Sequence, residues 1–149
     1  MGVKKKVDSL IRKHNTNCRF QIAEKIGIQV QFEPLGEILG YYSRHFRIPF
    51  IHINENIGED QIGFVCGHEL GHATLHPKSN TPFLKKHTYY STHKIEREAN
   101  GFAVELLIPD EDLDDFKDHN ITIYEAANMY GIPKDLVQLK TVEKFDKKI

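Results

Sequence analysis

Apolar residues recur along the chain with two different periods, and the change between these periods predicts the order of the secondary structure. An apolar residue at every third or fourth position indicates a helix with one buried face, and strict alternation indicates a strand with one buried side. We therefore expect helices, then strands, then helices again. The expected helices cover residues 3–14, 18–26, 60–76 and 92–108, and the expected strands cover residues 28–32, 38–43 and 49–53.

The last third of the chain has the pattern of a helix, a glycine turn and a second helix. Thr122 and Glu125 have the spacing of a capping box at a helix start, and Gly131 marks the turn. We assign residues 110–149 to a helical C-terminal subregion of a single domain, 1–149. The expected fold class is α+β, with a small three-stranded sheet packed against helices.

A helix-turn-helix pattern raises the question of DNA binding. A helix that reads DNA normally offers arginine, asparagine or glutamine near its start, with basic residues directed toward the phosphates. Here the second helix offers only Gln138 and Lys140 as candidate contacts. The pattern therefore favours packing or partner docking over direct nucleic-acid binding.

The composition is that of one compact globular domain. The chain has 149 residues, of which 40% are hydrophobic and 28% charged, and its net charge is −1. Such a charge gives no general attraction to nucleic acid or membranes. No apolar run reaches the roughly 18 residues of a membrane span and no signal peptide is evident, so we expect a cytoplasmic protein without a membrane partner. Cys18 and Cys66 lie far apart, which favours reduced thiols.

The candidate chemistry centres on the motif His-Glu-Leu-Gly-His at residues 68–72, in the third expected helix. Histidines four residues apart share one face of a helix, so both imidazoles reach one metal ion. Glu69 lies beside that face, where a carboxylate can take a proton from metal-activated water. The motif predicts a zincin-like metal helix with His68 and His72 as ligands and Glu69 as catalytic base. Gly71 predicts close approach by a neighbouring element, since glycine costs a helix about 1 kcal/mol relative to alanine.

A catalytic zinc ion needs a third protein ligand. A metzincin would place a histidine six residues after His72, but Lys78 stands there, so that class is excluded. His76 continues the same helix face, yet it lies about 12 Å along the axis from His68 and cannot share one ion with it. A carboxylate from a following helix is the remaining simple solution.

The fourth expected helix supplies that carboxylate. Glu96 and Asn100 share one face, so Glu96 is predicted to bind zinc while Asn100 hydrogen-bonds the free nitrogen of a ligand histidine. Ala99 leaves room for the two helices to touch. Glu98 points about 200° away around the helix, and we expect it to be solvated.

Between these two helices, residues 78–91 are expected to form a loop at the rim of the cleft, since long loops in small domains are often functional. A tetrahedral oxyanion would need a second electrophile beside the metal. Tyr89, Tyr90, His87 and His93 lie in or near this loop, and the sequence does not choose among them.

Three segments together resemble the ImmA/IrrE family of bacterial and phage metallopeptidases, over roughly residues 5–140. The resemblance implies a gluzincin-like site of two histidines and one glutamate. It also implies a cytoplasmic peptidase that often cuts a helix-turn-helix repressor encoded beside it on a mobile element. One difference is Asn100, where gluzincins often have aspartate. The segments are His68-Glu-Leu-Gly-His72, Glu96-Arg-Glu-Ala-Asn-Gly-Phe-Ala103 and Glu105-Leu-Leu-Ile-Pro109, and Ile51-His-Ile-Asn-Glu-Asn56 fits the same family.

We therefore expect a site-specific peptidase with Zn²⁺ as cofactor and a protein substrate, a helix-turn-helix repressor of a phage or mobile element. Two alternatives stay open: a metal-dependent DNA-binding transcriptional regulator, and a non-catalytic interaction module whose metal is structural. Glu69 favours hydrolysis, because a structural site needs no general base and usually closes with a fourth ligand. The sequence does not indicate the cleavage site, the activating signal or the oligomeric state.

Overall fold

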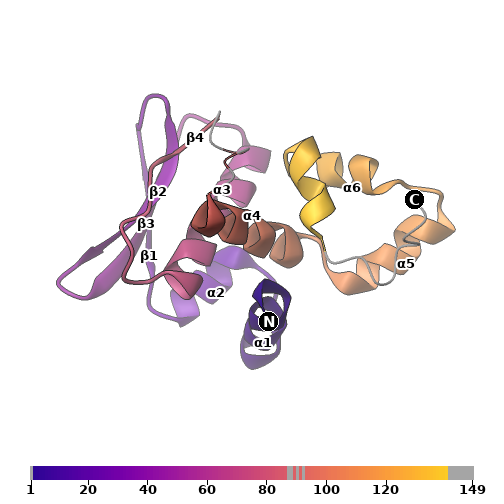
Figure 1. Ribbon diagram of the computed structural model, residues 1–149, viewed down its shortest axis with the longest axis horizontal. Helices are drawn as coiled ribbons and strands as arrows, with labels where there is room; N and C mark the ends of the chain where they lie inside the picture. Colours follow the sequence, from indigo (N-terminus) through magenta and orange to yellow (C-terminus); the bar gives the residue numbers. More distant parts are fainter. Residues whose placement is uncertain (1, 87–88, 90, 92, 141–149) are drawn as a thin grey trace.

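The computed structural model describes residues 2–86, 89, 91 and 93–140, and it confirms the α+β class. The sheet lies at one end of the molecule and the C-terminal helices lie at the other (Figure 1). The strands are β1 (Gln29–Glu33), β2 (Ile38–His45), β3 (Ile48–Asn54) and β4 (Leu84–Lys85). The helices are α1 (Val3–His14), α2 (Arg19–Lys25), α3 (Glu59–Leu75), α4 (Lys94–Leu107), α5 (Asp110–Asp118), α6 (Ile123–Met129) and the 3₁₀ helix η2 (Lys134–Leu139).

Within the described residues the sheet has four strands, so the prediction of three was wrong. The strand order is β1-β3-β2-β4, with β1 parallel to β3 and with β2 antiparallel to both β3 and β4. The additional strand, β4, has two residues and lies in the segment that we expected to be a loop. So short a strand shows no alternation, and it is defined by its pairing with Ile38 and Gly40 of β2.

Helix α3 is central because it packs against the sheet on one side and against α4 on the other (Figure 1). Every residue from Gly63 to His72 is buried. The contact with α4 is close: a Cβ atom on Gly71 would lie 3.0 Å from Phe102 Cβ and 3.2 Å from Ala99 Cα. The predictions that Gly71 marks a close approach and that Ala99 makes room for it are confirmed.

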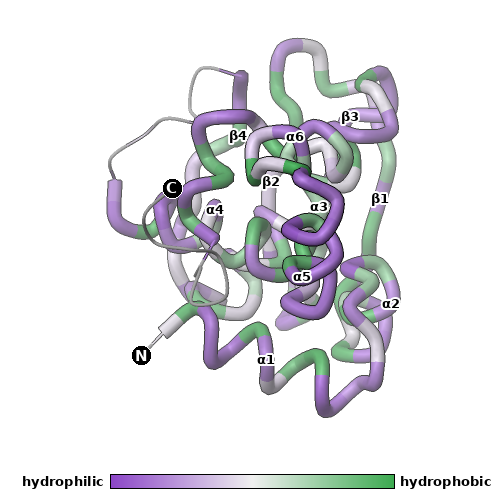
Figure 2. Tube along the Cα trace, turned by 90° about the vertical axis from the view of Figure 1, so that its right-hand side faces the viewer, coloured by the Kyte–Doolittle hydropathy of each residue, from purple (hydrophilic) through white to green (hydrophobic). Residues whose placement is uncertain are grey.

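Helix α1 covers the outer side of α4. Polar and apolar stretches alternate along it (Figure 2), as expected for a helix with one buried face. Val7 and Leu10 supply the buried face. Both cysteines are free thiols; Cys66 is buried in α3, whereas Cys18 is only partly buried. None of the described helices has the length and apolar character to cross a membrane.

The C-terminal pattern is confirmed only in part. The Thr122 Oγ1 atom accepts a hydrogen bond from the Glu125 N–H at 3.1 Å, and the Glu125 carboxylate accepts one from the Thr122 N–H at 2.9 Å, which completes the predicted capping box. Gly131 adopts a φ of 70° in the expected turn. The element that follows, however, is a six-residue 3₁₀ helix rather than an α-helix. It therefore does not offer the α-helix that a major-groove reader requires.

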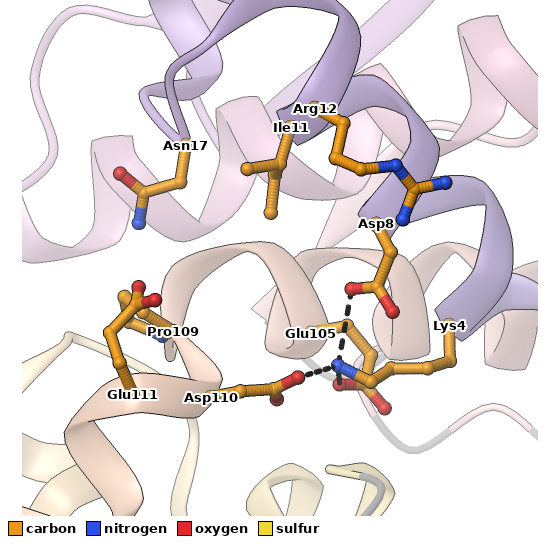
Figure 3. Close-up of a pocket in the computed structure, with 9 residues that line it drawn as sticks. All are labelled: Lys4, Asp8, Ile11, Arg12, Asn17, Glu105, Pro109, Asp110 and Glu111. Atoms are coloured by element: carbon orange, nitrogen blue, oxygen red, sulfur yellow. Dashed lines mark hydrogen bonds and ion pairs between the residues drawn. The ribbon is translucent and has the colours of Figure 1, made fainter.

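Lys140, one of the two candidate DNA contacts, is buried. Its Nζ atom donates hydrogen bonds to Glu105 Oε1 at 3.0 Å, to the Ile108 carbonyl at 2.7 Å and to Asp110 Oδ1 at 2.7 Å. Lys4 of α1 donates to the other oxygen of Asp110 and approaches Glu105 Oε1 at 3.8 Å (Figure 3). Lysines from both ends of the described chain thus bind the same two carboxylates.

Candidate metal centre

The two motif histidines and the glutamate of the following helix meet in the interior of the protein. His68 and His72 lie one turn apart on α3, and Glu96 lies in the first turn of α4. One donor atom from each of the three lies within 4.8 Å of the others. The His68 and His72 side chains are fully buried, and the Glu96 side chain is 3% exposed. The structure therefore brings together the three residues that the sequence predicts as ligands.

The donor atoms lie at the separations that ligands of one ion have, and His68 Nε2 and Glu96 Oε1 are also within hydrogen-bond distance. His68 Nε2 lies 3.1 Å from Glu96 Oε1, and His72 Nε2 lies 2.9 Å from Glu96 Oε2. Yet neither His72 Nε2 nor Glu96 Oε2 has a hydrogen-bond partner among the described residues. Ligand atoms of tetrahedral zinc lie about 3.3 Å apart, because each is about 2.0–2.1 Å from the ion. The two-histidine, one-carboxylate set thus fits a divalent metal such as zinc.

Asn100 holds the first histidine. Its Oδ1 atom lies 2.8 Å from His68 Nδ1, while its Nδ2 atom donates to the Tyr89 carbonyl at 2.9 Å. Because the amide oxygen only accepts, His68 Nδ1 must carry the proton, which leaves the Nε2 lone pair directed at the cluster. The predicted hydrogen bond between Asn100 and one of the motif histidines is confirmed, with His68 as the donor.

Glu69 is fully buried, and neither of its carboxylate oxygens has a hydrogen-bond partner among the described residues. The sheet comes close to it at Gly40, where a Cβ atom would lie 3.7 Å from Glu69 Cγ and only 2.5 Å from Val65 Cγ1. A residue larger than glycine would push β2 away from this part of α3. The carboxylate therefore lies in a tightly packed, buried position.

The two buried carboxylates have opposite pKa shifts. Burial is the largest influence on Glu69 and raises the pKa of its carboxyl to about 8. Burial acts the same way on Glu96, but the adjacent imidazoles of His68 and His72 outweigh it and lower the pKa of Glu96 to about 2. Neighbouring acids whose pKa values are driven apart are typical of a site with one proton carrier and one permanent anion.

The imidazoles also differ. Burial lowers the pKa of His72, which favours the neutral form that binds metal. Burial opposes the charge on His68 as well, but the hydrogen bond to Glu96 and the charge of Glu69 outweigh it and raise the pKa of His68.

The expectation that Glu98 is solvated holds only in part, because its side chain is 36% exposed but also hydrogen-bonded. Its Oε1 atom accepts a hydrogen bond from His76 Nε2 at 2.7 Å. His76 in turn lies with its Nδ1 atom 3.2 Å from His72 Nδ1. Glu98 does not join the cluster of Glu96. It is reached instead by the ring of His76, which lies just past the end of α3.

Known proteins with similar sequences show which family the chain belongs to. The IrrE N-terminal-like domain, a peptidase family, matches residues 23–141. An immunity region protein 2 of Bacillus phage phi105 is 43% identical over 139 residues, which are 93% of this chain and 88% of that protein. The metallopeptidase ImmA of Bacillus subtilis strain 168 is 35% identical over 116 residues, which are 76% of this chain and 68% of that protein. The chain belongs to the ImmA/IrrE family.

The oxyanion candidates of this ImmA/IrrE protein divide into two groups. His87 and Tyr90 lie outside the described residues. Tyr89 is 7% exposed, and its ring packs edge-on against Phe64 at 5.5 Å between centroids. His93 is exposed and is the N-cap residue of α4.

The described part of the expected rim also contributes Lys86 and Tyr89 to a groove of about 590 Å³ between the start of α3 and the α6–η2 turn.

Two features of the ImmA/IrrE site were not predicted from the sequence. One is strand β4; the other is the His76–Glu98 pair behind His72. A sequence signal for the pair existed, since His72 and His76 are four residues apart. That spacing also allows a hydrogen bond between the two rings.

Proposed function

We propose that this chain is a zinc-dependent, site-specific peptidase of the cytoplasm. The observation that supports it best is Glu69, a buried carboxylate without a hydrogen-bond partner in the described structure, beside the donor set of His68, His72 and Glu96. An unpaired buried carboxylate destabilises a fold, and a structural zinc site has no use for one. The family match and the relative named metallopeptidase ImmA support the same chemistry.

In this proposal His68, His72 and Glu96 would hold the zinc ion. Zinc supplies Lewis-acid chemistry when bound: it activates water and polarises the scissile carbonyl. Glu69 takes the proton from the attacking water and later delivers it to the leaving amine. A cation beside Glu69 favours its carboxylate form, so the group would begin the cycle as a base. Asn100 keeps His68 in the tautomer whose Nε2 lone pair faces the site.

We propose a helix-turn-helix repressor of a phage or mobile element as the substrate. The similar protein of Bacillus phage phi105 is an immunity region protein, and the family resemblance of the sequence points to a repressor encoded nearby. The groove beside Tyr89 would receive part of the substrate chain, because it opens next to the segment that leads into α4.

The alternatives receive less support. A DNA-binding regulator would need basic residues on an exposed α-helix, whereas Lys140 is buried and the second C-terminal helix is of the 3₁₀ type. A module with a structural metal would leave Glu69 without a role. Binding to operator DNA without cleavage of any repressor would nevertheless favour the regulator.

The test is cleavage of the purified repressor encoded by the neighbouring gene. We expect a single cut that requires zinc and that is slowed by about 10²–10⁴-fold in Glu69→Gln, the range of a lost general base. Zinc binding should be retained in this variant. Glu59→Gln is the matched control, since Glu59 is an exposed glutamate of the same helix. Cleavage by Glu69→Gln at the wild-type rate would exclude Glu69 as the base.

A further inference from the structure

His76 and Glu98 form a short hydrogen-bonded chain that ends on a predicted metal ligand. His76 Nδ1 lies 3.2 Å from His72 Nδ1, and His76 Nε2 lies 2.7 Å from Glu98 Oε1. Exposure rises along this chain, from 0% for the His72 side chain through 9% for His76 to 36% for Glu98. The chain therefore leads from the buried cluster to the surface between α3 and α4.

The geometry of this chain determines where its protons lie. Glu98 as a carboxylate only accepts, so His76 Nε2 must donate to it. Neutral His76 then has a lone pair on Nδ1, and it accepts a hydrogen bond from His72 Nδ1–H. With its proton on Nδ1, His72 presents the Nε2 lone pair to the cluster, which is the form that a metal ligand requires.

The backbone places His76 for this contact. His76 is the C-cap residue of α3, with φ −131° and ψ 50°, so it has left the helical conformation. Its N–H still donates to the His72 carbonyl at 2.8 Å. The same residue thus contacts His72 through both backbone and side chain, with the two ring centroids 5.3 Å apart.

We propose that His76 and Glu98 are positioning residues that orient His72 and fix its tautomer for metal binding. This inference rests on the proposed zinc site. The two ligand histidines would then be held differently: a neutral amide, Asn100, holds His68, and an imidazole–carboxylate pair holds His72. Of these two hydrogen-bonded paths, the one through His76 ends on a carboxylate, that of Glu98. Glu98 comes from the same helix as Glu96.

The experiment measures zinc affinity by competition with a chromophoric chelator, on the full chain. His76→Ala should weaken zinc binding by about tenfold to a hundredfold, the usual range for a lost partner of a ligand histidine. His76→Gln should stay within about threefold of wild type, because its amide accepts from His72 and donates to Glu98 as the imidazole does. Glu98→Ala should weaken binding by about tenfold. Arg97→Ala is the control, an exposed neighbour on the same helix.

A spectroscopic readout accompanies the affinities. In zinc-loaded wild-type protein the His72 Nδ1 proton should give a slowly exchanging imidazole NMR signal, and His76→Ala should lose it. Circular dichroism establishes that each variant is folded. If His76→Ala fails to fold, Glu98→Ala and Glu98→Gln decide the matter, since Glu98 is more than one-third exposed. The amide of Glu98→Gln still accepts from His76, so this variant should bind zinc more tightly than Glu98→Ala.

The outcomes are distinct. Wild-type zinc affinity in folded His76→Ala and in Glu98→Ala would overturn the positioning role. Equal weakening in His76→Gln and His76→Ala would overturn it too, because packing rather than hydrogen bonding would then be responsible. Failure of the wild-type chain itself to bind zinc would instead refute the proposed metal site.

Discussion

The side-chain amide of Asn100 joins two parts of the protein: its Oδ1 atom lies 2.8 Å from His68 Nδ1, and its Nδ2 atom donates to the Tyr89 carbonyl at 2.9 Å. All three groups are buried. One residue thus fixes the tautomer of His68 and attaches the segment before α4 to that helix.

Substitutions at Asn100 should separate these two roles. Asn100→Ala should weaken zinc binding by about tenfold to a hundredfold, because His68 loses its partner. Asn100→Asp keeps an acceptor for His68 but cannot donate to Tyr89, so it should retain more zinc affinity while lowering the free energy of unfolding by about 1–3 kcal/mol. Chelator competition and urea unfolding measure the two effects. Wild-type zinc affinity in Asn100→Ala would contradict this view.

Zinc should stabilise the protein, with one ion bound per chain. A ligand that binds only the folded state at 100 times its dissociation constant adds about 2.7 kcal/mol to the free energy of unfolding. Zinc should therefore raise the melting temperature, and a chelator should reverse the rise. His72→Ala and Glu96→Ala should lose most of this response. Full zinc occupancy in purified Glu96→Ala, measured by elemental analysis, would contradict the assignment of Glu96 as a ligand.

Gly71 and Gly101 should respond in opposite directions to the same substitution. A Cβ atom on Gly71 meets Phe102 Cβ at 3.0 Å and Ala99 Cα at 3.2 Å, so Gly71→Ala forces α3 and α4 apart and should destabilise the fold by about 1–3 kcal/mol. The nearest such contact of Gly101 is Val3 Cγ1 at 3.8 Å, an ordinary distance. Gly101→Ala should therefore stabilise α4 by about 0.5–1 kcal/mol. Denaturant unfolding of both variants tests the pair, and destabilisation of similar size in both would rule out the close approach as the cause.

The ion pairs of Asp110 with Lys4 and Lys140 should make the free energy of unfolding depend on pH. Hydrogen bonds from Lys140 and Lys4 outweigh the effect of burial and lower the pKa of Asp110. A carboxyl whose pKa is lower in the folded protein contributes stability above its unfolded pKa, and that contribution is lost as the pH falls through the folded value. Urea unfolding should thus show a loss of stability below about pH 5 that is smaller in Asp110→Asn. Glu111→Gln, an exposed neutralisation in the same helix, should leave the wild-type pH profile unchanged.

The sequence predicted those features that depend on local periodicity. Helix α1 has the predicted bounds, and the three predicted ligands, His68, His72 and Glu96, lie together as their places on consecutive helices suggested. Residues four apart share a face in any regular helix, so only the packing of α3 on α4 remained to be found. Gly71 and Ala99 indicated that packing because small side chains allow helices to approach closely.

The features that the sequence did not predict depend on contacts distant along the chain. Strand β4 is defined by its partner β2, about 45 residues earlier. The burial of Lys140 depends on Glu105 and Asp110, which lie outside the local pattern. The hydrogen bond of Glu98 was not predicted for the same reason, since its partner His76 belongs to another helix.

The shared carboxylates of Glu105 and Asp110 also bear on how the protein is made. Lys140 is among the last of the described residues to leave the ribosome, whereas α4, which carries both Glu96 and Glu105, is complete more than thirty residues earlier. During synthesis Glu105 therefore has Lys4, at 3.8 Å, before it has the buried Lys140, and a buried charge with fewer partners opposes burial of the helix that bears it. The packing of α4 would therefore become complete only when Lys140 emerges.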